Sequence, residues 1–194
     1  MYSLMSCLVI RPRRFEDPRG WFSETWNQAR FRSVGIDAEF CQDNQSLSRP
    51  AGTLRGLHFQ SPPHAQAKLV RCLRGRIFDV AVDIRRASPT FGKWVGLELS
   101  AENGKQLFIP AGYGHGFLTM EPDCEIAYKV DDYYAAECDG GIAWDCPTIG
   151  VDWPLRGDGP VLSDRDTALP PLTQFAIDFR YDGNPLAPLV EVTA

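Results

Sequence analysis

The chain has 194 residues, of which 44% are apolar and 23% are charged, and its formal net charge is -5 at pH 7. This acidic balance excludes a general nucleic-acid binder, which carries a basic face, and no apolar run approaches the ~20 residues that cross a bilayer. We therefore expect one globular domain over residues 1–194, without nucleic-acid or membrane partners.

The N-terminal part of the chain contains one predicted helix. Residues 1–10 lack the basic stretch, apolar core and small-residue cleavage site of a secretory signal peptide, so we expect none. The basic cluster at 11–14 is interpreted as a solvated edge. Apolar residues recur near the helical period over 26–34 and Gly35 follows them, which predicts a short helix there.

The middle of the chain is dominated by β-strand signals. Short segments rich in β-branched and aromatic residues alternate with turns that contain Gly, Pro, Asn and Ser. In chain order, the predicted strands are 69–72, 75–84, 93–99, 106–109, 116–120, 125–130 and 142–144. We therefore predict an all-β fold, a barrel or jelly roll, with short helical segments at its N- and C-terminal ends.

The predicted strand at 77–84 has two different faces. One face carries Phe78, Val80, Val82 and Ile84, and the other carries Ile77, Asp79, Ala81 and Asp83. An apolar face opposite a half-polar face is expected of a strand that lies between the core and a polar cavity.

The C-terminal part is rich in Pro, Gly and Asp from about Pro147 onward. We expect a barrel core over about 40–150 and a segment at 151–194 that packs on it. The cysteines include no Cys-x-x-Cys pair, which weakens both a zinc site and a redox motif. We expect them to be reduced and the protein to be cytoplasmic; they are Cys7, Cys41, Cys72, Cys124, Cys138 and Cys146.

His58, in the run Leu-Arg-Gly-Leu-His-Phe-Gln, is the leading candidate for proton transfer, because the unperturbed pKa of histidine lies near neutrality. Residues 110–115 fit the Pro-x-Gly-x-x-His part of the cupin metal pattern, but the His-x-His part is missing. Gln60 stands at the second position after His58, and His64 is too far along the chain to replace it. We therefore expect no metal and no cofactor.

Several long strings occur in order between about Phe15 and Asp166. They are Asp-x-Arg-Gly-x-Phe-x-Glu, Gln-x-Asn-x-Ser, Leu-Arg-Gly-Leu-His-Phe-Gln, Pro-Pro-x-x-Gln-Ala-Lys-Leu-Val, Gly-x-Ile-x-Asp-Val-x-Val-Asp-Ile-Arg, Ser-Pro-Thr-Phe-Gly-Lys and Pro-x-Gly-x-x-His-Gly-Phe. Together they resemble the dTDP-4-dehydrorhamnose 3,5-epimerase family, the nucleotide-sugar epimerases of the cupin superfamily. The resemblance implies a cupin-type jelly-roll barrel and an isomerase that acts on a dTDP-4-keto-6-deoxy sugar, in dTDP-L-rhamnose or related deoxysugar biosynthesis.

The reaction of this family suits the residues present. Hydrogens on C3 and C5 of a 4-keto sugar are α to the carbonyl, so a base can remove either one and leave an enolate. Reprotonation from the opposite face then inverts the carbon. By resemblance, the catalytic residues are His58 as the base, Asp166 as its orienting partner, Tyr128 as the proton donor on the opposite face and Lys68 beside the enolate oxygen.

Each of these residues also has an ordinary structural interpretation. His58 is alternatively a hydrogen-bonded barrel histidine, and Lys68 a side chain that extends to the rim. From the residues alone, Tyr128 competes with Tyr133 and Tyr134, and Asp166 competes with Asp164 and Asp83.

Substrate-binding positions also follow from the resemblance. Arg19 and Arg55 match positions that hold the diphosphate, whose oxygens suit the guanidinium fork. Tyr133 matches the residue that stacks on the base, and His115 matches a position in the cavity beside the sugar. Positions near the nucleoside are matched by Phe22, Glu24, Gln42 and Asn44. The family implies a homodimer in which the N-terminal block of one subunit completes the nucleotide site of the other.

The resemblance leaves the inverted carbon open. Related enzymes of antibiotic pathways invert only C3 or only C5 with much the same residues, because slight tilts of the sugar decide which carbon is reprotonated. The nucleotide can also differ from dTDP. Two other classes remain: a non-catalytic cupin would lack one of the proton-transfer groups, and a sugar ketoisomerase would carry a different arrangement of histidines.

Overall fold

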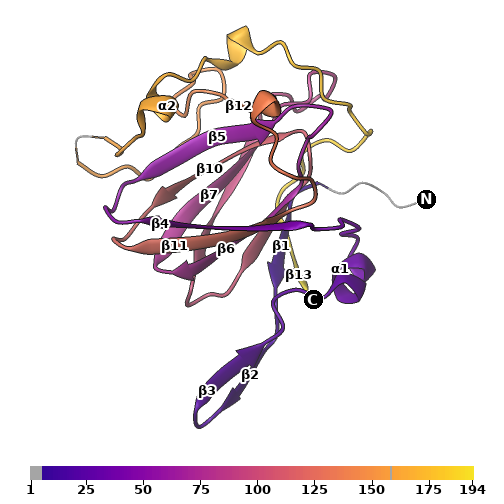
Figure 1. Cartoon of the computed structure of the whole chain (residues 1–194), viewed down its shortest axis with the longest axis vertical. Helices are drawn as coiled ribbons and strands as arrows, with labels where there is room; N and C mark the ends of the chain where they lie inside the picture. The colour runs from indigo at the N-terminus through magenta and orange to yellow at the C-terminus, as the bar shows by residue number, and fades with distance from the viewer. Residues whose placement is uncertain (1–5, 158) are drawn as a thin grey trace.

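The structure is a computed structural model that describes residues 6–157 and 159–194. Residues 1–5, half of the stretch considered for a signal peptide, lie outside the described residues. Two sheets face each other and form a jelly-roll barrel (Figure 1). The predicted all-β fold with short helical segments near both ends is confirmed.

The larger sheet has six strands in the order β13-β1-β9-β6-β11-β4. Their bounds are Val190–Thr193 for β13, Leu8–Arg11 for β1, Gln106–Ile109 for β9, Lys68–Arg74 for β6, Cys124–Val130 for β11 and Gln42–Ser48 for β4. All neighbours pair antiparallel except β1 and β13, which run parallel. This sheet therefore joins the two ends of the described chain.

The second sheet has five antiparallel strands in the order β12-β5-β10-β7-β8. Their bounds are Asp139–Gly141 for β12, Leu54–Gln60 for β5, Tyr113–Thr119 for β10, Arg76–Asp83 for β7 and Trp94–Ser100 for β8. His115 of β10 lies opposite both His58 and Ala81. Because directly opposed residues share a face, one face of this sheet gathers polar side chains.

A two-stranded ribbon of β2 (Arg14–Asp17) and β3 (Gly20–Ser23) projects from the body of the barrel (Figure 1). It exposes three large apolar side chains: Phe15, Trp21 and Phe22 are 45%, 55% and 69% exposed. Exposed apolar side chains gathered in one place are typical of a surface that contacts a partner.

The predicted helix at 26–34 is shorter in the structure, where α1 spans Gln28–Ser33. Asn27 begins it as the N-cap, because its side-chain oxygen accepts from the amides of Ala29 and Arg30. Trp26 lies outside the helix and packs on Phe31, with ring centroids 4.5 Å apart, as in a hydrophobic staple.

The other helical turns are short. They are α2 (Asp164–Thr167) and the 3-10 turns η1 (Ala136–Cys138) and η2 (Leu172–Gln174). Among the described residues, the helices are all too short or too polar to cross a membrane.

Six of the seven predicted strands are confirmed, but the strand predicted at 142–144 is wrong. The strand β12 lies three residues earlier, where Gly140 and Gly141 run against β5. A Cβ on Gly141 would meet the carbonyl oxygen of Leu57 at 2.8 Å, so the glycines allow this close approach. Ile142 is fully buried, which explains its strand-like apolar signal.

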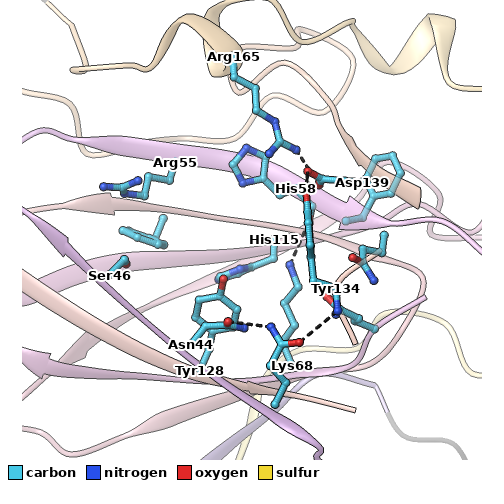
Figure 2. Close-up of a pocket in the computed structure, with 15 residues that line it drawn as sticks. Asn44, Ser46, Arg55, His58, Lys68, His115, Tyr128, Tyr134, Asp139 and Arg165 are labelled. Carbon is cyan, nitrogen blue, oxygen red and sulfur yellow. Dashed lines mark hydrogen bonds and ion pairs between the residues drawn. The ribbon is translucent and has the colours of Figure 1, made fainter. Parts of the chain in front are cut away.

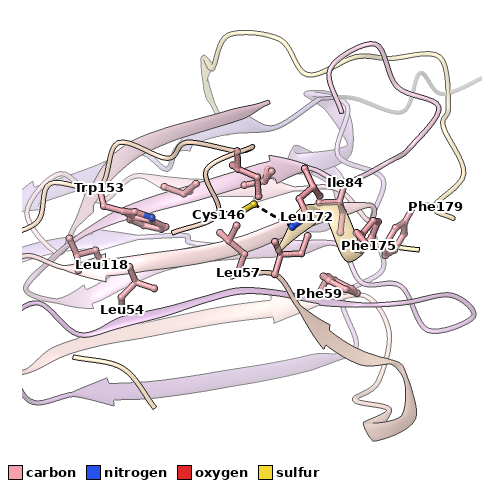
Figure 3. Close-up of a cluster of buried hydrophobic side chains, with 14 residues drawn as sticks. Leu54, Leu57, Phe59, Ile84, Leu118, Cys146, Trp153, Leu172, Phe175 and Phe179 are labelled. Carbon is pink, nitrogen blue, oxygen red and sulfur yellow. Dashed lines mark hydrogen bonds between the residues drawn. The ribbon is translucent and has the colours of Figure 1, made fainter. Parts of the chain in front are cut away.

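The outer face of the five-stranded sheet carries a large hydrophobic cluster (Figure 3). Leu172, Phe175 and Phe179, from the C-terminal part of the chain, contribute to it, and Phe59 meets both phenylalanine rings edge to face. A second cluster, which includes Ile77 and Ala81, lies on the other face of β7. The five-stranded sheet therefore carries apolar side chains on both faces, and its polar side chains lie among them.

Candidate active site

A cavity of about 440 Å³ opens between the two sheets (Figure 2), a volume typical of small-molecule sites. Seven of the predicted residues line it: Gln42, Asn44, Arg55, His58, Lys68, His115 and Tyr128. The structure therefore gathers most of the predicted site into one place.

His58 and Asp166 form a hydrogen-bonded pair at the cavity wall. The Nε2–H of His58, on β5, donates to Oδ1 of Asp166 at 2.5 Å. Asp166 is only 5% exposed and also accepts from the Ser163 hydroxyl at 2.7 Å. Burial works to raise the pKa of Asp166, but the hydrogen bonds from His58 and Ser163 outweigh it, so that pKa lies below its ordinary value. The ionised carboxylate leaves Nδ1 of His58 as the basic nitrogen.

The two competing aspartates are placed elsewhere. Asp83 is fully buried in an ion pair with Arg85, with 2.8 Å between carboxylate and guanidinium. Asp164 is exposed at the start of α2. Of the three aspartates considered, Asp166 is the one that contacts His58.

Lys68 lies on β6, in the sheet opposite to that of His58. It is 8% exposed, and its Nζ donates to the carbonyl oxygen of His58 at 3.4 Å. Burial lowers the pKa of Lys68 to about 8, against the opposing effect of Asp79. A lysine with this pKa is mainly cationic at neutral pH and can still lose its charge in the mildly alkaline range.

Tyr128 lies on β11, also in the sheet that faces His58. Burial raises the pKa of Tyr128 above its ordinary value; Arg55 opposes this effect and Asp139 adds to it. The phenol therefore keeps its proton at neutral pH and can donate it. Of the competing tyrosines, Tyr134 lines the cavity and Tyr133 is 66% exposed and does not.

Besides Tyr133, which was predicted to stack on the base, three other predicted binding residues do not line the cavity of their own subunit. Arg19 and Phe22 lie on the projecting ribbon, and the Arg19 guanidinium pairs with Asp17 at 2.6 Å. Glu24 follows the ribbon and pairs with Arg30 at 3.4 Å.

Sequence reasoning missed several residues that line the cavity. They are Ser46, Phe59, Gln60, Gln66, Phe117, Tyr134, Asp139 and Arg165. Ser46 follows Gln42 and Asn44 at the period of a strand, a signal that was available. By contrast, Asp139 and Arg165 come from different elements and meet in an ion pair at 2.7 Å, which no local pattern reports.

The described residues contain no group of three or more His, Cys, Asp and Glu side chains placed to share a metal ion. His58 and His115 are each bonded to a carboxylate, Asp166 and Asp79. The expectation of a site without metal stays a prediction.

Comparison with known proteins gives the same match along most of the chain. The family model described as dTDP-4-dehydrorhamnose 3,5-epimerase matches residues 2–174. A dTDP-4-dehydrorhamnose 3,5-epimerase of Sinorhizobium fredii is 52% identical over 179 residues, which cover 92% of this chain and 91% of that protein.

Two solved structures are similar over most of their length. A dTDP-6-deoxy-D-glucose-3,5-epimerase from Legionella pneumophila, in complex with dTDP-4-keto-L-rhamnose, is 43% identical with a TM-score of 0.84, covering 89% of this chain and 93% of that chain. A 3'-monoepimerase from Streptomyces bikiniensis, in complex with dTDP-quinovose, is 35% identical with a TM-score of 0.80. The match covers 87% of this chain and 84% of that chain.

Proposed function

This chain belongs to the dTDP-4-dehydrorhamnose 3,5-epimerase family, and on that premise we propose how its site works. Its fold is the cupin-type jelly-roll barrel that the sequence predicts. It is an isomerase that inverts carbons next to the 4-keto group of a dTDP-4-keto-6-deoxyhexose. The observation that carries the mechanism is the placement of His58 on one sheet and of Tyr128 and Lys68 on the other, around one cavity.

In the proposed mechanism, Nδ1 of His58 removes a hydrogen from a carbon α to the carbonyl. Asp166 holds the ring through Nε2 and stabilises the imidazolium that forms. The Lys68 ammonium stabilises the negative charge that develops on the carbonyl oxygen. Tyr128 then donates a proton to the carbon from the other face, which inverts the centre.

Solvent exchange followed by NMR tests this function. The protein is incubated with dTDP-4-keto-6-deoxyglucose in deuterated water, and the signals of the C3 and C5 hydrogens are followed. We expect both signals to disappear as deuterium enters and the epimerised sugar forms. Absence of exchange at both carbons would contradict the proposal for this substrate.

A second candidate function is inversion of one carbon alone. It is favoured by the likeness to the 3'-monoepimerase, whose TM-score is close to that of the double epimerase. Exchange confined to C3 or to C5 in the same experiment would support this candidate. The identity to the double epimerases is higher, so we propose inversion at both carbons.

We also propose that the enzyme is a homodimer whose ribbon completes the nucleotide site of the partner. The ribbon leaves Phe22 69% exposed, and Arg19 lies there, outside the cavity of its own subunit. On the cavity wall, Arg55 supplies one guanidinium for the diphosphate. Arg19 of the second subunit would supply another, and the apolar ribbon would be buried in the interface.

Mixed dimers test the shared site. We expect Arg19→Ala and His58→Ala each to be poorly active alone, and their co-expression to restore about a quarter of wild-type activity, since half of the dimers then hold one intact site. Co-expression of His58→Ala with Tyr128→Phe is the control, because both residues line one cavity and no intact site forms. Equal activity in the two mixtures would show that Arg19 does not act across subunits.

The compartment and the domain boundaries are proposals as well. All six cysteines are free, which supports a reducing compartment, and we propose the cytoplasm. Recovery of the protein outside the cytoplasmic fraction of its cells would contradict this.

We propose one domain over 1–194, with a barrel core at about 40–150 and the segment 151–194 packed on it. Limited proteolysis that released 151–194 as a freely separable piece would contradict that division.

A further inference from the structure

Asp79, on β7, is a carboxylate enclosed in the barrel interior. It is 0% exposed, and its Oδ1 accepts from Nε2 of His115 at 2.8 Å. Its Oδ2 is buried as well and has no hydrogen-bond partner among the described residues. An ionised, half-satisfied carboxylate in an apolar interior is costly unless positive charge lies near it. We therefore expect positively charged groups to lie near Asp79 in the barrel interior.

The strand register places Asp79 beside the proposed catalytic groups. His58 on β5 lies opposite His115 on β10, and Phe117, two residues on, lies opposite Asp79 on β7. Directly opposed residues and residues two apart share a face, so His58, His115 and Asp79 point to the same side of the sheet. Lys68 reaches the same space from the facing sheet.

The contact with Asp79 determines which nitrogen of His115 is available. A carboxylate only accepts hydrogen bonds, so Nε2 of His115 carries the hydrogen. Burial lowers the pKa of His115, and although Asp79 opposes this, the pKa stays below its ordinary value. The ring is therefore neutral at neutral pH, and Nδ1 is an acceptor. Because His115 lines the cavity, a hydroxyl of the sugar is the group that Nδ1 suits.

Asp79 also supports the charge of Lys68. Burial is the largest influence on the pKa of Lys68 and lowers it, and Asp79 exerts the largest opposing effect. The other charged groups that act on Lys68 are Asp139, which favours the cation, and Arg165, which disfavours it. The remaining titratable groups of the cavity are His58, His115, Tyr128 and Tyr134, with Arg55 as a further fixed charge.

We propose that Asp79 is a positioning residue of this site: it fixes the His115 ring with Nδ1 as an acceptor for a sugar hydroxyl, and it supplies the negative charge that keeps Lys68 cationic. The assignment to His115 rests on the proposed function, whereas the coupling between Asp79 and Lys68 does not depend on any substrate. Asp79 itself touches no reacting atom.

The wild-type protein offers a direct test, because it has only three histidines and four lysines, Lys68, Lys93, Lys105 and Lys129. Long-range nitrogen–proton NMR of the free enzyme should show His115 neutral at pH 7 with the hydrogen on Nε2. The hydrogen on Nδ1, or a protonated ring, would overturn the assignment to His115. Carbon-13 labelling of the lysine ε-carbons follows the titration of Lys68 separately.

Asp79→Asn removes the charge and keeps the shape of the side chain. We expect Lys68 to titrate at lower pH than in the wild type. If the pKa of Lys68 falls by about one unit, kcat/KM falls about fivefold at pH 8 and less than twofold at pH 6.5. The reason is that kcat/KM follows the protonated fraction of Lys68, which decreases much more at pH 8 than at pH 6.5. An unchanged Lys68 titration in a folded variant, or an equal loss of kcat/KM at both pH values, would overturn the proposal.

Asp83→Asn is the matched control. Asp83 lies on the same strand and face and is also 0% exposed, but it pairs with Arg85, which retains Asp182 as a second partner at 3.0 Å. We expect this variant to leave the Lys68 titration unchanged, and a shift equal to that of Asp79→Asn would overturn the assignment. Because the titrations need no substrate, failure of the epimerase function and failure of this coupling are distinguishable.

Discussion

His58→Ala is expected to abolish both solvent exchange and epimerisation, with kcat/KM reduced by about 10³-fold or more. A positioned general base accelerates a reaction by roughly 10²–10⁴-fold. Among the hydrogen-bond partners of Asp166 in the described residues, His58 is the one that has a basic side chain. The nucleotide contacts proposed for Arg55 and Asn44 remain, so dTDP affinity should change by only a few fold. Calorimetry with dTDP and deuterium exchange of the keto sugar measure the two effects separately.

The control for this prediction is His64→Ala. His64 pairs with Asp132 at 3.1 Å, its side chain is 43% exposed, and it does not line the cavity. We expect this variant to retain wild-type exchange rates. Exchange retained in His58→Ala would mean that another group removes the hydrogen, and the assignment of the base would be wrong.

The strands predicted correctly are those whose side chains are themselves typical of buried sheets. The strand β7 includes all but the last residue of the alternating run 77–84, and β11 contains Ile126 and Val130 in the core. By contrast, β4 has the sequence Gln-Asp-Asn-Gln-Ser-Leu-Ser, which has low β propensity, and it is a strand because its backbone pairs with β11. The pairing of β1 with β13 joins the two ends of the chain, which no local pattern predicts.

The residues of the candidate site likewise divide into those that the local sequence indicates and those that depend on contacts between distant parts of the chain. His58 and Arg55 are neighbours in a single string on β5, so local sequence was sufficient to select them. Asp166 is 108 residues away from His58, and only the family resemblance paired them before the structure showed the hydrogen bond. Asp79 is the clearest omission: the half-polar face of its strand was recognised, but its contact with His115 depends on the pairing of β7 with β10.

Tyr128→Phe should separate the two halves of the reaction. His58 remains able to remove an α hydrogen and to return a deuteron from solvent to the same face, so exchange should continue. Inversion needs a donor on the opposite face, and Tyr128 lies on the sheet that faces His58. We expect formation of the epimerised sugar to fall by about 10²–10³-fold, the usual contribution of a general acid. NMR resolves exchange without inversion from exchange with inversion in one sample.

Tyr134→Phe is the matched control, because Tyr134 also lines the cavity and was one of the two alternative donors. Its hydroxyl donates to Asp139 at 3.2 Å, so it is held at the cavity wall near Arg165. We expect this variant to epimerise within about tenfold of the wild type, since only one hydrogen bond is removed. If Tyr134→Phe lost inversion while Tyr128→Phe kept it, Tyr134 would be the donor. If Tyr128→Phe lost exchange as well, its hydroxyl would act before or during proton removal, at the enolate oxygen beside Lys68.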